Sequence, residues 1–170
     1  MIYLASASPQ RAFLLAKAGI AAEVVKTVHD EDSIWLPHPQ AMALERARHK
    51  ALTVTLDLLP RPWADGDAVL AADTVTSLKG KVYGKPADRA DAIRILEAIQ
   101  GTTHTVTTAH CLLVPAMQGR GPVMACGVSL AQVTMRPVSR AEIEAYVDTG
   151  ESHERSGAYA IQESGDRFVI

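Results

Sequence analysis

The opening of the chain constrains the fold most strongly, because it predicts a short strand that leads directly into a helix. Residues 2–5 are apolar and suit a strand, whereas Ser8 and Pro9 suit the N-cap and first position of a helix that continues to about residue 18. The third helical position holds Arg11, where the partial positive charge of a helix N-terminus disfavours a cation until an anion is bound. This arrangement predicts a phosphate-binding loop. The alternative is an ordinarily capped helix whose arginine is solvated.

The composition favours one ordinary domain or two small lobes, because 170 residues are enough to bury a hydrophobic core. A net charge of −2 argues against general binding to nucleic acid. The sequence shows no cationic, apolar leader and no apolar run of membrane-spanning length. We therefore expect a soluble, cytoplasmic protein with a small-molecule partner, and no binding to nucleic acid or membrane.

The two cysteines, Cys111 and Cys126, both fall in predicted strands. Neither has a histidine or a further cysteine at metal-ligand spacing. We expect both to be reduced and to act as small, buried hydrophobic side chains.

The order of predicted elements indicates an α/β fold. A second strand over residues 21–27 completes a β-α-β unit. An acidic, proline-marked loop over 29–39 precedes a helix from about residue 40 to residue 58, and the apolar run 68–75 predicts a central strand buried on both faces. Later, a helix over about 88–99 is followed by a hairpin of strands at 103–114 and 123–135. Ser139 and Glu142 match a capping box at the start of the last helix.

Asp73 is the clearest chemical signal, because it follows apolar residues at the end of the predicted central strand. A buried carboxylate requires a metal, a basic partner or a proton, and ligands bind at the ends of central strands in α/β folds. We interpret Asp73 as a metal ligand or general base; the alternative is a structural aspartate that caps a local turn. Glu31, in the acidic loop, is a candidate second carboxylate, although such a loop taken alone is typical of solvated surface.

Lys50 and Lys85 complete a set of charged residues that suits a metal-assisted reaction on a polyphosphate. Taken singly, a lysine beside the apolar stripe of a helix and a lysine in a Gly-Lys-Pro turn are typical of solvated residues. Together with Arg11 they would hold phosphate groups, while the carboxylates of Glu31 and Asp73 would hold a hard divalent cation, Mg²⁺ or Mn²⁺. The sequence contains no Walker-type phosphate loop, which argues against a P-loop NTPase.

A series of ordered motifs covers nearly the whole chain. They are SASPQR (6–11), ARHKA (47–51), ADT (72–74), GKP (84–86), GTTHTVTT (101–108), and TGE with GAYAIQ (149–151 and 157–162). In this order and spacing they resemble the motifs of Maf-type nucleoside triphosphate pyrophosphatases, once described as septum formation inhibitor proteins. The forms of these motifs are most similar to those of the dTTP/UTP pyrophosphatase branch.

The resemblance implies an α/β fold in which helices flank a central mixed β-sheet and two lobes surround a nucleotide-binding cleft, as in Maf and ITPase proteins. It implies a hydrolase of the nucleotide diphosphatase type, which converts dTTP, UTP or modified pyrimidine nucleotides to the monophosphate and pyrophosphate with a divalent metal. Residues 1–170 would form a single Maf-like domain, shortened at the C-terminus relative to the family, and the family is often homodimeric.

The resemblance also assigns roles to residues. Asp73 would be the proton acceptor, Glu31 and Asp73 would bind the metal, Lys85 would assist catalysis, and Ser8, Gln10, Arg11, Lys50, Thr74 and Gln162 would bind the substrate. Gln162 offers the donor and the acceptor that a pyrimidine edge requires. We expect His104 to orient a neighbouring side chain rather than to bind metal.

The chain departs from the family pattern in ways that leave other functions open. Gln10 replaces the first arginine of the phosphate loop, Glu154 and Arg155 replace Asp-Lys, and residues 168–170 would form an exposed edge strand if the family's C-terminal piece is absent. One alternative is a catalytically impaired Maf-like protein that binds nucleotides or a division-related partner. Another is a nucleic-acid-binding module that uses the basic cluster of Arg11, Arg46, Arg48 and Lys50, although aromatic residues are few.

Overall fold

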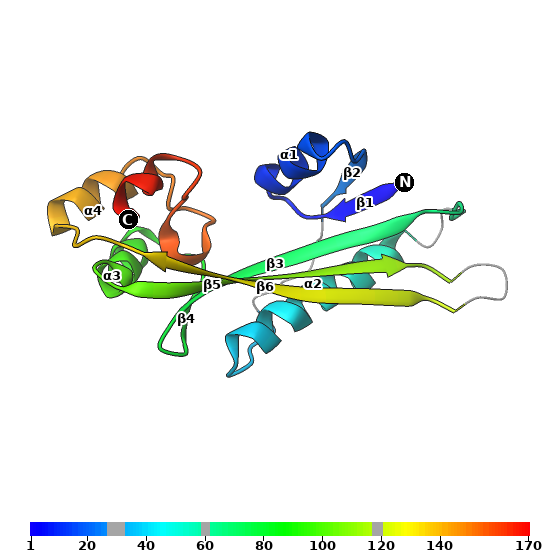
Figure 1. The fold of residues 1–170 in the computed structure, drawn as a ribbon, viewed down its shortest axis with the longest axis horizontal. Helices are drawn as coiled ribbons and strands as arrows, with labels where there is room; N and C mark the ends of the chain where they lie inside the picture. The colour runs from blue at the N-terminus through cyan, green and yellow to red at the C-terminus, as the bar shows by residue number, and fades with distance from the viewer. Residues whose placement is uncertain (27–32, 59–61, 117–120) are drawn as a thin grey trace. The chain divides into compact units, whose positions relative to one another are not determined.

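The computed structural model of the chain describes residues 1–26, 33–58, 62–116 and 121–170. A mixed β-sheet organises the fold, with the strand order β2-β1-β3-β5-β6 and β4 paired to β3 (Figure 1). Its strands are β1 (Ile2–Ala5), β2 (Ala22–Val25), β3 (Ala68–Leu78), β4 (Lys81–Tyr83), β5 (Thr103–Val114) and β6 (Val123–Thr134). The helices are α1 (Pro9–Lys17), α2 (Pro39–Asp57), α3 (Arg89–Ile99) and α4 (Arg140–Val147), with the 3₁₀ turns η2 (Ser156–Ala158) and η3 (Ser164–Phe168). This α/β architecture is the one that the sequence predicts. Over the described ranges, no helix combines the length and the apolar character needed to span a bilayer.

The chain forms two compact units, each built from segments that are distant in sequence. The first unit consists of Met1–Leu36, Gln40–Asp73 and Thr108–Val128. The second consists of Pro37–Pro39, Thr74–Thr107 and Ser129–Ile170. Strands β3, β5 and β6 therefore each contribute residues to both units.

The predicted β-α-β opening is present in the first unit. Strand β1 pairs in parallel with β2 on one side and with β3 on the other. Both neighbouring strands stay in continuous register with β1. At the end of β1, Ala5 lies opposite Val25 and Ala71. Leu4 and Ala5 are buried, which anchors the strand from which the predicted phosphate loop departs.

Helix α2 buries one stripe along its length. The stripe contains Met42, Ala43, Ala47, Lys50, Ala51, Thr53 and Val54. The burial of Lys50 within it contradicts the interpretation of this lysine as a solvated residue. A lysine is almost never buried without a partner, so its position requires one.

Strand β3 is longer than predicted. It continues past Asp73 to Leu78, because its last residues pair with β4, beginning with Thr76 opposite Tyr83. Asp73 is therefore not at the end of its own strand, and that prediction was wrong. It lies just beyond the end of β1, which stops opposite Ala71, so the carboxylate is still placed at an edge where the parallel pairing ends.

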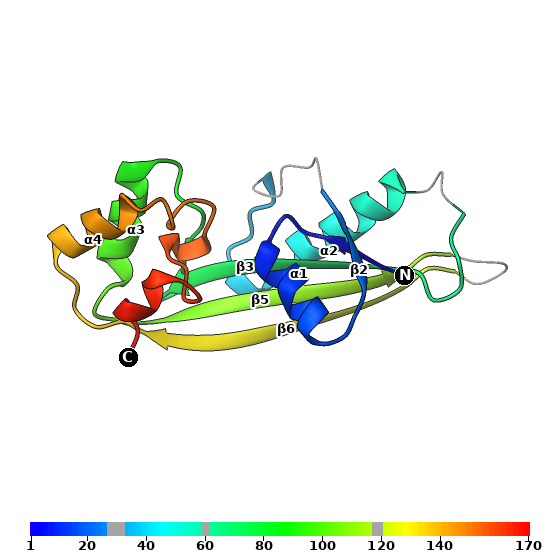
Figure 2. The ribbon, with the colours of Figure 1, turned by 90° about the horizontal axis from the view of Figure 1, so that it is seen from above.

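The second unit has its own hydrophobic core, in which α3 packs against α4 (Figure 2). Its largest fully buried side chains include Ile95, Leu96, Ile99, Met135, Ile143, Tyr146 and Phe168. The rings of Tyr146 and Phe168 meet edge to face, with their centroids 5.1 Å apart. The predicted capping box of α4 is confirmed, since Ser139 and Glu142 exchange hydrogen bonds at its N-terminus.

Strands β5 and β6 form the predicted hairpin, and a disulfide joins them. Contacts pair Thr103 with Thr134, Thr105 with Gln132 and Cys111 with Cys126, so each step forward in β5 matches a step backward in β6. This antiparallel register brings the Cα atoms of Cys111 and Cys126 to 4.2 Å. Cys111 is buried as predicted, but Cys126 is exposed. The prediction of two reduced, buried cysteines was therefore wrong, because the sequence spacing did not reveal which residues face each other across the hairpin.

The last residues of the chain do not form the exposed edge strand that was predicted. Phe168 is only 1% exposed and belongs to the core of the second unit. Val169 makes a single antiparallel bridge with Met135, next to the end of β6, and only Ile170 is largely exposed. The aromatic ring of Phe168 is stabilised by burial, which outweighs the strand propensity of this segment.

Candidate active site

The loop between β1 and α1 is held by its serines. Ser8 occupies the N-cap position with an extended backbone, and Pro9 lies in the first turn, as predicted. The Ser8 hydroxyl does not cap the helix but donates to Gln10 Oε1 at 3.1 Å. The Ser8 backbone N–H donates to Ser6 Oγ at 3.2 Å, and Ser6 is buried. The first turn of α1 contains no acidic side chain, so none offsets the positive end of this helix.

Arg11 turns back from α1 toward the sheet. Its Nη1 donates to Ser6 Oγ at 2.9 Å and to the backbone oxygen of Ala72 at 2.8 Å. Burial lowers the pKa of Arg11 below its ordinary value, and the nearby Asp73 carboxylate offsets part of that effect. Arg11 is thus bound into the protein and is not the solvated arginine of the alternative interpretation.

Lys50 reaches from α2 to the same place on β3. Its Nζ donates to Asp73 Oδ1 at 3.0 Å and to the backbone oxygen of Ala72 at 3.2 Å. The side chains of Lys50 and Asp73 are only 9% and 8% exposed, so this is a buried ion pair. Such a pair needs further hydrogen bonds to offset the cost of removing both charges from water. The carbonyl of Ala72 supplies one of them.

The second carboxylate oxygen of Asp73 is the most informative atom of the site. Asp73 Oδ2 is buried and has no hydrogen-bond partner among the described residues. Buried polar atoms rarely lack a partner, so this oxygen is suited to accept a proton or to bind a water or a hard cation. The described ranges contain no group of three or more side chains that could hold a metal, and Glu31, the predicted second ligand, lies outside the described residues.

Three further predicted residues, Thr74, Lys85 and Gln162, belong to the second unit. Thr74 follows Asp73 on β3 and is half-buried. The exposed Lys85 places its Nζ 3.6 Å from Glu154 Oε2, in an exposed ion pair. Gln162 is exposed on the turn between η2 and η3. The structure thus joins Arg11, Lys50 and Asp73 in one network, and the substrate contacts assigned to the second unit remain predictions.

Sequence reasoning missed a clamp that fixes the second unit's GAYAIQ segment. Ser156 Oγ accepts from the Thr76 N–H at 2.8 Å and donates to the Tyr83 backbone oxygen at 3.2 Å. Next to it, Gly157 has φ +78°, and a Cβ there would lie 2.8 Å from Thr76 Oγ1. Only the glycine was a visible signal in the sequence, since Ser156 lies just before the GAYAIQ motif.

His104 takes the structural role that was expected of it. The ring is buried, and its Nε2 lies 2.9 Å from the hydroxyl of Tyr159. Burial lowers the pKa of His104 and raises the pKa of Tyr159 to about 12. Both groups are therefore held neutral, and the hydrogen bond joins β5 to the segment that follows η2.

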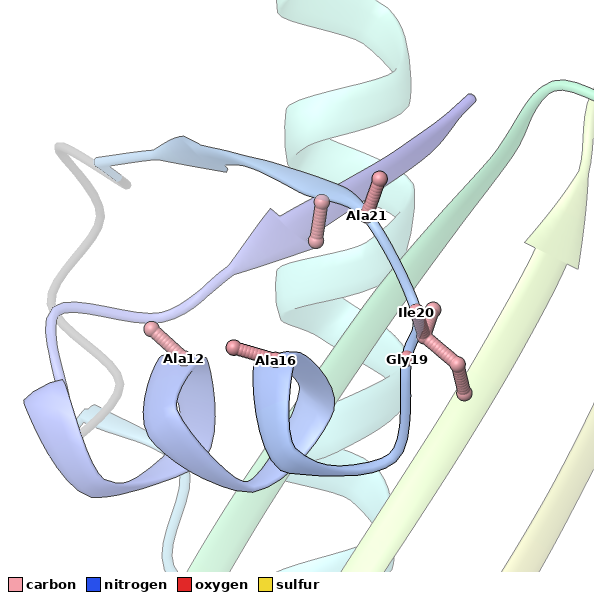
Figure 3. Close-up of a pocket in the computed structure, with 6 residues that line it drawn as sticks. Ala12, Ala16, Gly19, Ile20 and Ala21 are labelled. Atoms are coloured by element: carbon pink, nitrogen blue, oxygen red, sulfur yellow. The ribbon is translucent and has the colours of Figure 1, made fainter.

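A separate hollow lies between α1 and β2 (Figure 3). Its lining residues are Ala12, Ala16, Gly19, Ile20, Ala21 and Ala22. None of these six side chains carries a charge, so the hollow does not suit a triphosphate. The polar network around Asp73, and not this hollow, is the candidate active site.

Taken together, the α/β fold and the buried Lys50–Asp73 pair beside a helix N-terminus define a protein equipped to act on a phosphorylated ligand. The chain belongs to the family described as Maf-like protein, which it matches over residues 1–170. It is 42% identical to the dTTP/UTP pyrophosphatase of Anaeromyxobacter dehalogenans strain 2CP-1, over 99% of this chain and 80% of that protein.

Two other relatives are similar over comparable lengths. A nucleoside triphosphate pyrophosphatase of Synechococcus sp. strain CC9605 is 39% identical, over 95% of this chain and 85% of that protein. The dTTP/UTP pyrophosphatase of Thermococcus kodakarensis is 36% identical, over 99% of this chain and 84% of that protein. All three relatives are pyrophosphatases of nucleoside triphosphates, and two of them are specified as acting on dTTP and UTP.

Proposed function

We propose that this protein hydrolyses nucleoside triphosphates to the monophosphate and pyrophosphate, with dTTP, UTP and modified pyrimidine nucleotides as preferred substrates. The observation that carries the proposal is the buried Asp73 Oδ2, which has no hydrogen-bond partner among the described residues and lies next to a buried lysine. Membership of the Maf-like family and the names of the relatives support the same reaction.

In this reaction a water attacks phosphorus and the bridge between the α- and β-phosphates breaks. Lys50 holds Asp73 Oδ1, so Oδ2 is the oxygen that takes the proton of the attacking water. The electron pair of the broken P–O bond leaves with pyrophosphate. Burial keeps other water away from the carboxylate, and the lysine fixes its orientation.

A divalent cation, Mg²⁺ or Mn²⁺, is part of the proposal. Asp73 Oδ2 fits such an ion as an oxygen donor, and Glu31 would be the second donor. When bound, the cation supplies charge neutralisation and polarisation of the phosphate under attack.

The remaining substrate contacts are proposed from the family motifs. Lys85 would bind phosphate oxygens, because its exposed ion pair with Glu154 is weak enough to exchange for a more highly charged partner. Ser8 and Gln10 would face the phosphates at the start of α1, where backbone N–H groups favour anions. Gln162 and Thr74 would contact the base.

The test is pyrophosphate release by the purified protein with Mg²⁺ or Mn²⁺. The panel is dTTP, UTP, CTP, GTP, 7-methyl-GTP and pseudouridine triphosphate, each with and without EDTA. Selective, EDTA-sensitive release from dTTP and UTP is the expected result. No release from any nucleotide, by protein that still binds dTTP, would replace the proposal with that of an impaired nucleotide-binding protein.

We also propose that the protein acts in the cytoplasm, where its nucleotide substrates are found, and that it forms a homodimer. The support for a dimer is the outer strand β6, whose twelve residues carry no charge and no proline. Such an edge is an exposed template for pairing with a second strand.

A further inference from the structure

Arg11 and Lys50 converge on one backbone atom. The carbonyl oxygen of Ala72 accepts from Arg11 Nη1 at 2.8 Å and from Lys50 Nζ at 3.2 Å. A carbonyl oxygen has two lone pairs, so these two donors use its full accepting capacity. The carbonyl carbon is bonded to the nitrogen of Asp73, so both cations fix the peptide plane from which the Asp73 side chain departs.

The register of the sheet explains why this peptide needs such support. Strand β1 pairs with β3 only as far as Ala5 opposite Ala71. One step further along each strand come Ser6 and Ala72, and here the Arg11 guanidinium bridges them by bonding to Ser6 Oγ and to the Ala72 oxygen. Arg11 thus replaces the next rung of the ladder with side-chain hydrogen bonds.

Ser6 connects this bridge to the loop. Its Oγ accepts from Arg11 Nη1 at 2.9 Å and from the Ser8 N–H at 3.2 Å, and the residue is 5% exposed. The network therefore runs from the start of α1 through Ser6, Arg11 and the Ala72 carbonyl to Lys50 and Asp73.

We propose that Arg11 and Ser6 are positioning residues, which fix the backbone at Asp73 so that its Oδ2 faces the reacting water, in place of the phosphate contact that the family motif assigns to Arg11. This inference rests on the proposed hydrolysis of nucleoside triphosphates. A group that orients the base should affect turnover, because a displacement of about 1 Å can cost on the order of 100-fold in rate. A group that holds the triphosphate should instead affect binding.

The test separates these effects with Arg11→Met, Arg11→Lys, Ser6→Ala and the double variant Ser6→Ala/Arg11→Met. Arg94→Met is the matched control, because Arg94 is an exposed arginine of α3 whose ion pair is with Asp91. For each variant, kcat is measured with dTTP, and the Kd of the non-hydrolysable α,β-imido-dUTP is measured by calorimetry. Circular dichroism and thermal melting verify the fold.

If the inference is right, Arg11→Met lowers kcat about 100-fold while the Kd changes less than about threefold. Ser6→Ala, which keeps the arginine charge, lowers kcat about tenfold, and the double variant is no slower than Arg11→Met alone, because both changes break one network. Arg11→Lys restores part of kcat, and Arg94→Met matches the wild type.

A tenfold or greater rise in Kd for Arg11→Met with near-normal kcat would overturn the inference and would show that Arg11 binds the phosphates of the substrate. Additive effects of the two single changes on kcat would overturn it as well. If Arg11→Met does not fold, Arg11→Lys and Ser6→Ala carry the same comparison. An inactive wild-type protein would instead overturn the proposed function, and this inference with it.

Discussion

At the scale of single residues, Asp73 and Lys50 depend on each other. Removing one member of a buried ion pair leaves an uncompensated charge and typically costs 3–5 kcal/mol, about the same as a large cavity in the core. The intact pair adds little net stability, because the cost of removing both charges from water offsets their attraction. It does determine which oxygen of Asp73 has no hydrogen-bond partner among the described residues. Burial at this point is explained by the chemistry of the site better than by the stability of the fold.

Asp73→Asn should abolish turnover while the protein stays folded, with a lower melting temperature because the buried Lys50 loses its charged partner. Asparagine keeps an oxygen for Lys50 Nζ but cannot take a proton, so kcat should fall by about 10²–10⁴-fold. Pyrophosphate release measures the loss of turnover, and thermal melting measures the stability of the fold. Asp148→Asn is the control, because Asp148 is an exposed partner of Arg89, and it should keep normal activity. Unchanged hydrolysis by Asp73→Asn would remove Asp73 from the mechanism.

Gly157 is a residue whose replacement should disturb the second unit, because both its backbone conformation and its neighbours exclude a side chain. Gly157→Ala would have to adopt φ +78° and would bring a Cβ to 2.8 Å from Thr76 Oγ1. We expect a loss of about 2–5 kcal/mol in the free energy of unfolding, the sum of left-handed strain and overpacking.

The matched control for Gly157→Ala is Gly80→Ala. Gly80 has φ +80°, but apart from its chain neighbours no atom of the described residues lies within 4 Å of an added Cβ, so only the strain of about 1–2 kcal/mol applies. Urea denaturation of both variants gives the difference between their free energies of unfolding, which measures the cost of the contact with Thr76. Equal losses would show that the contact with Thr76 does not restrict this position.

At the scale of elements, the capping box of α4 should make stability depend on acid. Glu142 accepts hydrogen bonds from Arg136 and Ser139, which lower its pKa from 4.5 to about 2. A carboxylate with a lowered pKa stabilises the fold fully above its unfolded value and loses that effect as the pH falls through the folded value. The melting temperature should therefore drop between about pH 4.5 and pH 2, and protonation of Glu142 should cause part of this drop.

Thermal melts of wild type and Glu142→Gln from pH 7 to pH 2 measure this contribution. The variant should melt lower than the wild type at pH 7, and the two curves should converge near pH 2. Ser139→Ala removes the other half of the box without a titrating group, and it should cost about 1 kcal/mol at pH 7. Parallel curves for wild type and Glu142→Gln would contradict the assignment.

The sequence predicted an element well where its ends are determined by neighbouring residues, and poorly where they are determined by contacts with distant segments. Both ends of β5 were predicted, because alternation and flanking turn residues are local signals. The end of β3 was missed, because Asp73 looks like a stop and the pairing of Thr76 with Tyr83 that extends the strand involves a later segment. The burial of Lys50 was missed for the same reason, since its partner is 23 positions away along the chain. The network at Ser6 depends on the fold and could not be read from spacing.

At the scale of the whole molecule, the outer edge of β6 is the feature from which we predict self-association. The other outer strands of the described sheet, β2 and β4, are short, whereas β6 is a long outer strand without the lysines or prolines that usually protect an edge. Residues 168–170 reach only its last part, where Phe168 accepts from Arg136 and Ile170 donates to Thr134. Exposed Val123, Val128 and Leu130 lie along the rest.

A second copy suits this edge better than a charged partner does. Antiparallel pairing of β6 with itself about a two-fold axis would satisfy the outer backbone groups of both strands. Because β6 carries no charged side chain, no like charges would meet across the axis. Side chains of the partner strand would then lie beside Val128 and Leu130 on one face of the sheet and beside Val123 on the other.

The prediction is that light scattering after size exclusion gives twice the chain mass of 18.2 kDa. Leu130→Lys places a charge on β6 and should shift the protein to the monomer, because two lysines would be brought together near the axis. Leu56→Lys is the control, since Leu56 is 63% exposed on α2 and Leu130 is 56% exposed on β6. A wild-type monomer at about 100 µM, a concentration well above the Kd expected of a stable dimer, would contradict the pairing, as would equal effects of the two lysines. Loss of the dimer in Leu130→Lys alone, with pyrophosphate release retained, would assign β6 to self-association and leave the chemistry to the network around Asp73.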